Sequence, residues 1–331
     1  MDVMINKKVI IREAKATDRD SIISFFNEFN LPYLRDRSYW IWLNRIVTTD
    51  YSIVAIAEYE GKVIAHYAIV PLDINVLGFK YRGAQGLNAV VSEKHRNKVQ
   101  IYKVSNFAYK IARKRGIDFM YAFPNRGYWE MQVKIEGCKL LSVINSYKIA
   151  SNIYKEFPRE ITIDNFKGDK EDFFNMDKLV EYYNNFNNIS VHKNLSYYIN
   201  RYINHPQNLY SCHFIRITDE IEGFIVLKKY TNPYSKEISG HLIDYVISGN
   251  VSEKQLINIT NKYFNQKNIE NVIYWPTNNN FKEALKLFPF TLEFESFPCI
   301  KFFNKELNLE IKDKIMNFKN WNMNMGDCDV F

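Results

Sequence analysis

The chain has 331 residues, of which 47% are hydrophobic and 16% aromatic, and its formal net charge is +7 at pH 7. This length and composition indicate a folded globular protein with enough apolar side chains for one large or two ordinary domains. The positive charge is spread along the chain, which favours anionic ligands in general but predicts no nucleic-acid partner.

The sequence also gives no sign of a membrane-spanning helix, a secretion signal or a metal site. The apolar run at residues 64–72 is interrupted by His66 and Pro71, and it is far shorter than the roughly 20 residues of a membrane-spanning helix. No apolar region follows Lys7 and Lys8 as in a secretion signal, so we expect a cytoplasmic protein without membrane insertion. The four cysteines lie far apart with no Cys-x-x-Cys pair, so neither a disulfide framework nor a metal site is expected.

The first half of the chain predicts helices followed by a run of strands. Thr17 and Asp18 offer an N-cap to an amphipathic helix, and the apolar pattern then changes to an alternating or continuous one. Glu60-Gly61 is a hairpin signal, because such a turn needs a residue that tolerates positive φ. The elements expected here are strands over residues 9–13, 52–58, 63–70, 79–91, 118–123 and 140–147, and helices over residues 19–31, 38–47, 100–114 and 128–136.

The stretch from residue 87 to residue 102 carries the clearest chemical signal. Its apolar, β-branched start predicts a buried strand, its charged middle a tight turn, and its end the beginning of an amphipathic helix. A strand that leads directly into a helix presents backbone N–H groups at the positive end of the helix dipole. The stretch therefore predicts a site for an anionic group such as a pyrophosphate.

The order of elements over residues 9–147 resembles the Gcn5-related N-acetyltransferase (GNAT) fold. The run Arg96-Asn97-Lys98-Val99-Gln100-Ile101 stands where that superfamily has an Arg/Gln-x-x-Gly-x-Gly/Ala loop, with Val99 and Ile101 at the glycine positions. A second point of resemblance is Phe123-Pro124-Asn125 followed by a helix. The resemblance implies an acetyl-CoA site formed by Ala89, Val90, Val91, Arg96, Asn97, Lys98, Val99, Gln100, Ile101 and Asn125.

Two residues are candidates for acid–base chemistry in such an enzyme. Acetyl transfer from a thioester needs a deprotonated amine and a proton for the departing thiolate. His66, in a predicted apolar strand, is a candidate base, with a hydrogen-bonded core histidine as the alternative. Tyr128 is the phenol nearest to the position at which the family often has a tyrosine acid, with a packing role as the alternative.

The second half is interpreted as a degenerate copy of the first. Residues 273–278 echo residues 121–125, and Glu222-Gly223 is a proposed counterpart of Glu60-Gly61. The counterpart of the basic loop, residues 248–252, contains no arginine, so the cofactor is expected in the first half and the acceptor pocket in the second. His241 and Asp244, on one predicted strand, could face that pocket.

The expected fold class is therefore α/β (α+β) with two tandem GNAT-like domains, each a mixed, mostly antiparallel sheet flanked by helices. The predicted division is 1–150 for the first domain, 151–178 for a linker and 179–331 for the second domain with its tail. The ending Gly326-Asp327-Cys328-Asp329 resembles that of some tandem acetyltransferase-like proteins found with surface-polysaccharide genes.

These expectations define one leading function and two alternatives. The leading hypothesis is an acetyl-CoA-dependent N-acetyltransferase acting on a small amine, such as an amino sugar or a nucleotide-linked sugar. One alternative is a Fem-type aminoacyl or peptidyl transferase, although the sequence shows no sustained heptad for the coiled-coil arm of that family. The other is a degenerate GNAT-like binding module without catalysis.

Overall fold

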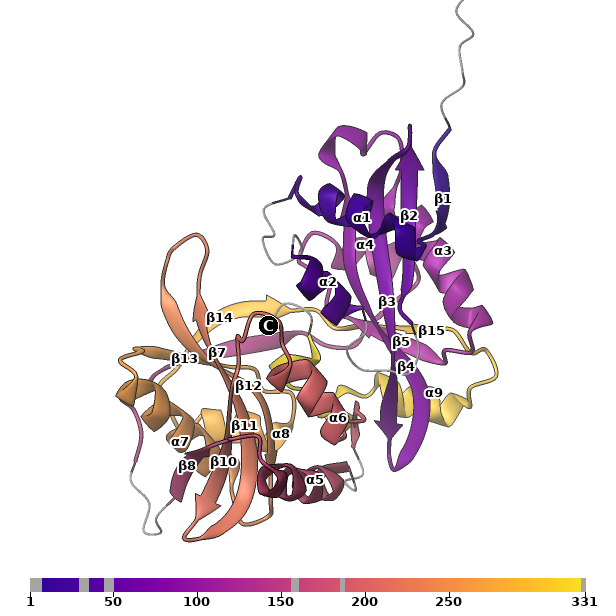
Figure 1. Ribbon diagram of the computed structural model, residues 1–331. Coiled ribbons are helices and arrows are strands. Elements are labelled where there is room, and N and C mark those ends of the chain that lie inside the picture. The colour runs from indigo at the N-terminus through magenta and orange to yellow at the C-terminus, as the bar shows by residue number, and fades with distance from the viewer. Residues whose placement is uncertain (1–7, 30–35, 45–50, 156–160, 185–187, 329–331) are drawn as a thin grey trace, which may run out of the picture. The chain divides into compact units, whose positions relative to one another are not determined.

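The computed structural model describes residues 8–29, 36–44, 51–155, 161–184 and 188–328. The chain forms two compact units, each built from several segments (Figure 1). The first unit contains residues 1–73, 81–140 and 298–308, and the second contains residues 74–80, 141–297 and 309–331. The expected mixed α/β class is confirmed, because each unit has a mostly antiparallel sheet flanked by helices.

The first unit is organised around a sheet with the strand order β1-β2-β3-β4-β5-β15-β6. Strands β4 and β5 run parallel, whereas β5 pairs antiparallel with β15. The strands are β1 (Ile10–Glu13), β2 (Ile53–Tyr59), β3 (Lys62–Val76), β4 (Phe79–Val91), β5 (Phe119–Ala122), β6 (Lys139–Leu140) and β15 (Cys299–Phe302), and the helices are α1 (Arg19–Phe26), α2 (Arg37–Leu43), α3 (Ile101–Lys114) and α4 (Trp129–Lys134).

Alternating side chains of this sheet bury two apolar layers. On β2, Ile53 and Ala55 join the core that includes α3, while Val54 and Ile56 join the core that includes α1 and α2. The β2–β3 hairpin turns at Glu60 and Gly61, whose φ values are 53° and 73°. The hairpin predicted from Glu60-Gly61 is thereby confirmed, since a two-residue turn with positive φ matches the twist of the strands.

The second unit has its own sheet, with the strand order β14-β7-β13-β12-β11-β10-β8. Within it, β12 and β13 run parallel, like β4 and β5 in the first unit, and a long helix connects the two strands in each case. The strands are β7 (Ile144–Ala150), β8 (Ile161–Asn165), β10 (Ser211–Ile217), β11 (Glu220–Thr231), β12 (Ile238–Ile247), β13 (Asn271–Tyr274) and β14 (Thr291–Ser296), and the helices are α5 (Lys170–Asn184), α6 (Leu195–Tyr198), α7 (Glu253–Gln266), α8 (Asn279–Leu285) and α9 (Leu309–Met316).

The sheets differ from the sequence-based expectations in three places. The strand expected at residues 140–147 is found mainly as β7, which pairs with β13 and β14 in the second sheet. Strand β15, from late in the chain, takes a place in the first sheet. The expected counterpart of the Glu60-Gly61 turn is wrong, because Glu222-Gly223 lies within β11 and the hairpin turns at residues 218–219.

The predicted linker contains regular structure. Strand β8 and the first part of α5 fall within residues 151–178, and β8 pairs antiparallel with β10. The three-part division of the chain itself stays a prediction. The end of β3 pairs with β9 (Ile189–Val191) at residues 74–76, which are assigned to the second unit.

The C-terminal segment of the second unit is held by a buried ionic cluster. Lys193 Nζ lies 2.9 Å from Asp244 Oδ2 and 3.0 Å from Asp327 Oδ1, and all three side chains are fully buried. Tyr202 donates a 2.6 Å hydrogen bond to Asp244. Asp244 and Asp327 therefore stabilise the fold of this unit, while Asp329 lies outside the described residues.

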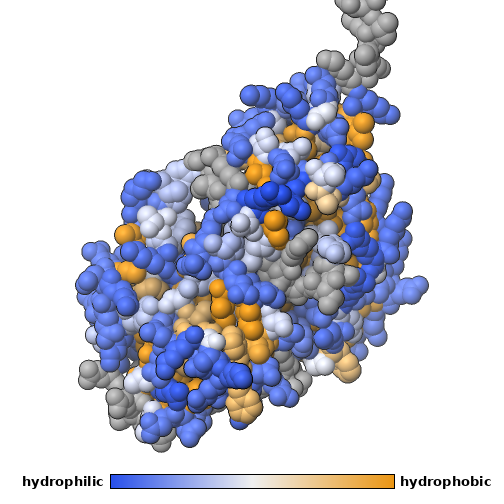
Figure 2. All heavy atoms as spheres, in the orientation of Figure 1, coloured by the Kyte–Doolittle hydropathy of each residue, from blue (hydrophilic) through white to orange (hydrophobic). Residues whose placement is uncertain are grey.

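On the face shown in Figure 2, hydrophilic residues predominate and hydrophobic ones form small groups.

Candidate functional site

The start of α3 has the features of an anion site. Gln100 is the N-cap residue, and within the described part of the chain its side chain makes no capping hydrogen bond. The corresponding helix of the second unit, α7, begins with a capping box formed by Ser252 and Gln255. The first N–H groups of a helix have no intrahelical partner, so those at the start of α3 can bind a ligand, whereas in α7 the side chains of the capping box already accept from the N–H groups of Ser252 and Gln255.

The loop before α3 adds exposed positive charge. Arg96, Asn97 and Lys98 are all exposed. The guanidinium of Arg96 donates a 3.1 Å hydrogen bond to Glu93, and its side chain is 67% exposed. Such a surface pair is weak and salt-dependent, so Arg96 can exchange Glu93 for an anionic ligand at little cost. Lys98 Nζ lies 5.2 Å from the centre of the Tyr59 ring.

The two residues at the family's glycine positions belong to the core. Val99 and Ile101 are 3% and 9% exposed and pack in the apolar cluster under α3. Neither is among the described residues with positive φ. The backbone of this loop therefore takes a conformation that β-branched residues tolerate, and their side chains point away from the exposed loop surface.

Strand β4 separates from β5 beside this loop. In the described register the pairing of the two strands ends at Gly86 and Ala122, although β4 continues to Val91. Asn88 has a φ of 54°, which marks an irregularity in the strand at this point. Beyond it, Ala89, Val90 and Val91 are half-buried, so their backbone groups on the β5 side can hydrogen-bond an extended ligand chain.

His66 holds the irregular part of β4. Its Nδ1–H donates a 2.9 Å hydrogen bond to the backbone carbonyl of Asn88, and this assignment leaves Nε2 as the unprotonated nitrogen. The side chain is fully buried against Phe26. Burial lowers the pKa of His66 to about 4, so the ring is neutral and a weak base at pH 7. The contact with Asn88 is a positioning contact, and a role as general base stays a prediction.

Tyr128 belongs to a buried chain of hydroxyl groups. Its hydroxyl donates a 2.5 Å hydrogen bond to Oε1 of Glu136, and the Tyr109 hydroxyl donates one of 2.5 Å to Oε2. The hydroxyls of Tyr109 and Tyr67 lie 3.3 Å apart, and the Tyr67 hydroxyl would lie 2.6 Å from a Cβ on Gly86. The chain thus runs from α4 to the place where β4 leaves β5. Burial raises the pKa of Tyr128, which keeps its hydroxyl protonated.

Asn125 has a local structural role in the turn before α4. It is exposed, and its side-chain oxygen accepts a 3.1 Å hydrogen bond from the backbone N–H of Gly127. Its backbone carbonyl accepts hydrogen bonds from the N–H groups of Tyr128 and Trp129. These contacts begin the helix that carries Tyr128, so the structure assigns Asn125 a turn function, and contact with a cofactor stays a prediction.

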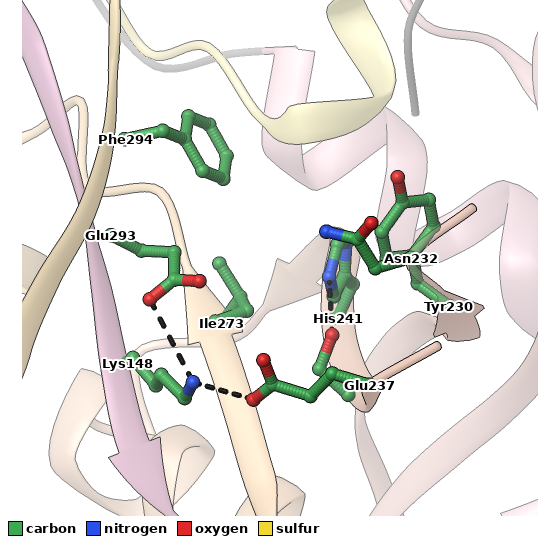
Figure 3. A pocket seen from close by; sticks show the side chains of 9 residues that line it. Lys148, Tyr230, Asn232, Glu237, His241, Ile273, Glu293 and Phe294 are labelled. Carbon is green, nitrogen blue, oxygen red and sulfur yellow. Dashed lines mark hydrogen bonds and ion pairs between the residues drawn. The ribbon is translucent and has the colours of Figure 1, made fainter. Parts of the chain in front are cut away.

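The second unit contains a pocket of about 260 Å³ on its sheet (Figure 3). Lys148 lies between two carboxylates, 2.5 Å from Glu237 and 3.8 Å from Glu293. Tyr230 and Phe294 add aromatic walls. One lysine against two glutamates gives this pocket a net charge of −1 when its histidine is neutral, which suits a neutral polyol or a cation.

His241 lines this pocket. His241 Nε2 and the Ser239 hydroxyl share a 3.0 Å hydrogen bond, and the His241 ring lies tilted by 32° to the Tyr230 ring, with centroids 5.0 Å apart. Burial, helped by the charge of Lys228, lowers the pKa of His241 to about 3, so it is neutral at physiological pH. Asp244, by contrast, lies in the buried cluster with Lys193 and not in the pocket.

The first unit brings some of the predicted site residues together, whereas Val90 packs against the other apolar cluster and Asn125 is exposed. Ala89, Val91, Val99, Ile101 and Tyr128 pack in or against one apolar cluster. Sequence reasoning missed Tyr67, Tyr109 and Glu136, since an aromatic residue in an apolar run gives no sign of its partner. The positive φ of Asn88 was also missed, although asparagine tolerates that conformation better than most residues.

Comparison with known proteins supports the GNAT fold. The family model "Acetyltransferase (GNAT) domain" matches residues 10–131. A GCN5-related N-acetyltransferase from Anabaena variabilis superposes with a TM-score of 0.66 at 12% identity, covering 90% of this chain and 73% of that one. N-myristoyltransferase of Saccharomyces cerevisiae, solved with bound myristoyl-CoA, gives 0.64 at 11% identity and covers 96% and 89%.

A third similar structure is the GCN5-related glucosamine N-acetyltransferase region of a fungal multi-domain β-N-acetylglucosaminidase. Its TM-score is 0.61 at 11% identity, with 91% of this chain and 39% of that chain covered. No curated protein matches the chain. The first part of the chain thus matches a GNAT family model, and the chain shares its fold with the two GNAT structures.

The described residues contain neither a membrane-spanning helix nor a metal-binding cluster. None of the helices in those ranges is both long and apolar enough to cross a bilayer. The same ranges hold no group of three or more His, Cys, Asp or Glu side chains arranged to bind a metal ion.

Proposed function

We propose that this chain is an acyl-CoA-dependent N-acetyltransferase that moves an acetyl group from acetyl-CoA to a small amine. The observation that carries the proposal is the start of α3, where a helix without a side-chain cap follows the exposed loop of Arg96, Asn97 and Lys98. This site lies in the region that matches the GNAT family model. The N-myristoyltransferase neighbour, solved with an acyl-CoA, supports an acyl-CoA donor.

The residues present fit the donor at both of its polar parts. The N–H groups of Gln100 and Ile101 and the guanidinium of Arg96 would hold a pyrophosphate, because both combine donors with positive charge. The backbone of residues 89–91 on the β5 side would hydrogen-bond the amides of a pantetheine arm. When bound, acetyl-CoA supplies an acyl group activated as a thioester.

Proton transfer is assigned to the chain's own residues as follows. The Tyr128 hydroxyl is proposed as the acid for the departing thiolate, which requires its O–H to turn from Glu136, to which it donates in this structure, towards the sulfur. His66, proposed from the sequence as the base, is buried and has a low pKa. We therefore propose that His66 has a positioning role: its hydrogen bond to the Asn88 carbonyl maintains the irregular shape of β4 beside the thioester.

For the acceptor we propose a small amine such as an amino sugar or a nucleotide-linked sugar, a molecule of the kind that the pocket of the second unit suits. Support comes from the excess carboxylate, which suits an ammonium group, and from the aromatic walls of Tyr230 and Phe294, which suit a sugar ring. One similar structure is named as a glucosamine N-acetyltransferase region. A role with surface polysaccharides would follow from such an acceptor, and it rests on the resemblance of the tail.

An assay of CoA release distinguishes the proposed function from its alternatives. The similar structures named above are acetyl- and myristoyltransferases, so the Fem-type alternative is not favoured. Release of CoA from acetyl-CoA is measured with a panel of amines that includes glucosamine. We expect turnover that falls about fivefold or more in kcat/KM for Arg96→Ala, because one charged contact to the donor is lost.

A matched variant separates this effect from a general loss of charge. Lys94 is an exposed lysine two residues before Arg96, and Lys94→Ala is expected to keep nearly full activity. Absence of turnover with every amine, together with normal binding of acetyl-CoA, would favour a non-catalytic binding module. Equal losses in both variants would contradict the specific role of Arg96.

A further inference from the structure

Lys228 is a buried amine in the second unit that the proposed function does not use. It lies on β11 with 9% of its surface exposed, directly opposite His241 in the β11–β12 register. Its Nζ is 5.7 Å from the centre of the Tyr210 ring and 6.0 Å from that of Tyr230. It also lines a cavity of about 330 Å³, so a small reagent can approach it.

The surroundings of Lys228 contain cations and aromatic rings where a buried lysine usually has an acid. In the described part of the chain it forms no ion pair, whereas Lys193, the other deeply buried lysine, contacts two carboxylates within 3.0 Å. Besides burial, the positive charge of Arg201, in the helical turn after α6, lowers the pKa of Lys228. The charge of Lys228 in turn adds to the effect of burial in lowering the pKa of His205 and of His241 on β12. Lys229 and Lys267 line the same cavity.

This environment disfavours the protonated amine. Burial, with a smaller effect from Arg201, lowers the pKa of Lys228 from 10.5 to about 8. The two histidines nearby are kept neutral in part by the charge of Lys228. The cation–aromatic contacts oppose this shift but replace only part of the lost hydration.

We propose that Lys228 is a nucleophilic amine that small acyl thioesters acylate in preference to the other lysines of the chain. The Nζ lone pair forms a bond to the acyl carbon, and the carbon–sulfur bond of the thioester breaks. The thiolate leaves with the electron pair of that bond and takes up the proton that the nitrogen loses, so the products are an amide on Lys228 and a free thiol. The modification removes the positive charge beside His241.

The expected preference follows from the fraction of free base. At pH 8 about half of an amine with a pKa near 8 is unprotonated, against roughly 0.3% for a lysine with a pKa of 10.5, a ratio of about 150. A less basic amine is intrinsically a weaker nucleophile, and partial burial slows approach. We therefore expect Lys228 to react about tenfold or more faster than an exposed lysine.

The test uses the full chain and S-acetyl-N-acetylcysteamine, a small acetyl thioester that does not need the nucleotide loop. Acetylation of each lysine is followed by mass spectrometry after digestion with a protease that does not cut at lysine. Lys229, exposed and next in the chain, is the internal reference. At pH 8 we expect Lys228 to be acetylated at least tenfold faster than Lys229, with a rate that levels off above about pH 9.

Two outcomes would overturn the inference. One is acetylation of Lys228 no faster than that of Lys229 in the folded wild-type chain. The other is a rate at Lys228 that still rises steeply between pH 9 and 10. Repeating the reaction with Arg96→Ala separates it from the proposed function, because the preference for Lys228 is expected to persist even where CoA-dependent turnover is lost.

Discussion

Replacing His66 with phenylalanine tests the link between a buried histidine and the shape of β4. The variant keeps a ring of similar size against Phe26 but removes the Nδ1–H that donates 2.9 Å to the carbonyl of Asn88. A buried carbonyl left without its donor costs about 1–3 kcal/mol of folding free energy. At pH 8 we therefore expect His66→Phe to be less stable than the wild type by about that amount.

The pH dependence of folding stability gives a second, independent test of the same variant. The pKa of His66 is about 4 in the folded chain and 6.5 when unfolded, so the unfolded chain binds a proton first as the pH falls. The stability that this residue contributes is therefore fully present above pH 6.5 and is lost toward pH 4. At pH 5 the loss is about 2 kcal/mol by linkage. His66→Phe has no such group and escapes this loss.

Urea unfolding at pH 8 and pH 5, followed by tryptophan fluorescence, measures both effects. The difference between the two pH values is expected to be about 2 kcal/mol larger in the wild type than in His66→Phe. Because the other histidines are common to both proteins, their contributions cancel. Equal acid sensitivity in the two proteins would refute the assignment of a neutral, buried His66.

Two further changes test the buried contacts of each unit. Lys193→Met leaves Asp244 and Asp327 buried without their cation and is expected to cost about 3–5 kcal/mol, measured by urea unfolding; a loss under 1 kcal/mol would contradict the buried cluster. Gly86→Ala places a Cβ 2.6 Å from the Tyr67 hydroxyl and is expected to cost about 1–3 kcal/mol, largely recovered in the double variant with Tyr67→Phe. No recovery in the double variant would place the clash elsewhere.

Local signals in the sequence predicted local structure well. Glu60-Gly61 marked its hairpin, and the apolar run before Arg96 marked the strand that leads into α3. These features depend on residues close in the chain, whose turn chemistry and periodicity are visible without the fold. The α/β class and the position of the basic loop therefore followed from the sequence.

Contacts between distant residues could not be predicted in the same way. Strand β7 pairs with β13 and β14, about 120 to 150 residues later in the chain, and β15 pairs with β5. An apolar strand is compatible with many neighbours, so its pattern does not identify its sheet. The family comparison also gave no sign of how Val99 fits at a glycine position, whereas in the structure Val99 packs in the core and its φ is not positive.

The buried polar groups were the least visible in the sequence. Glu136, which accepts from two tyrosines, and Asp327, which pairs with Lys193 from 134 residues away, look like ordinary surface carboxylates in the sequence. Their partners are fixed only when the fold brings separate elements together. In the structure Asp327 lies in the ionic cluster and in a capping box with Asn324.

Titration of the wild-type chain with acetyl-CoA in a calorimeter tests the central claim most directly. The loop of Arg96 to Lys98 and the uncapped start of α3 predict saturable binding of one acetyl-CoA per chain, weakened in Arg96→Ala and at high salt. The absence of binding at millimolar acetyl-CoA, in protein shown to be folded, would contradict the account.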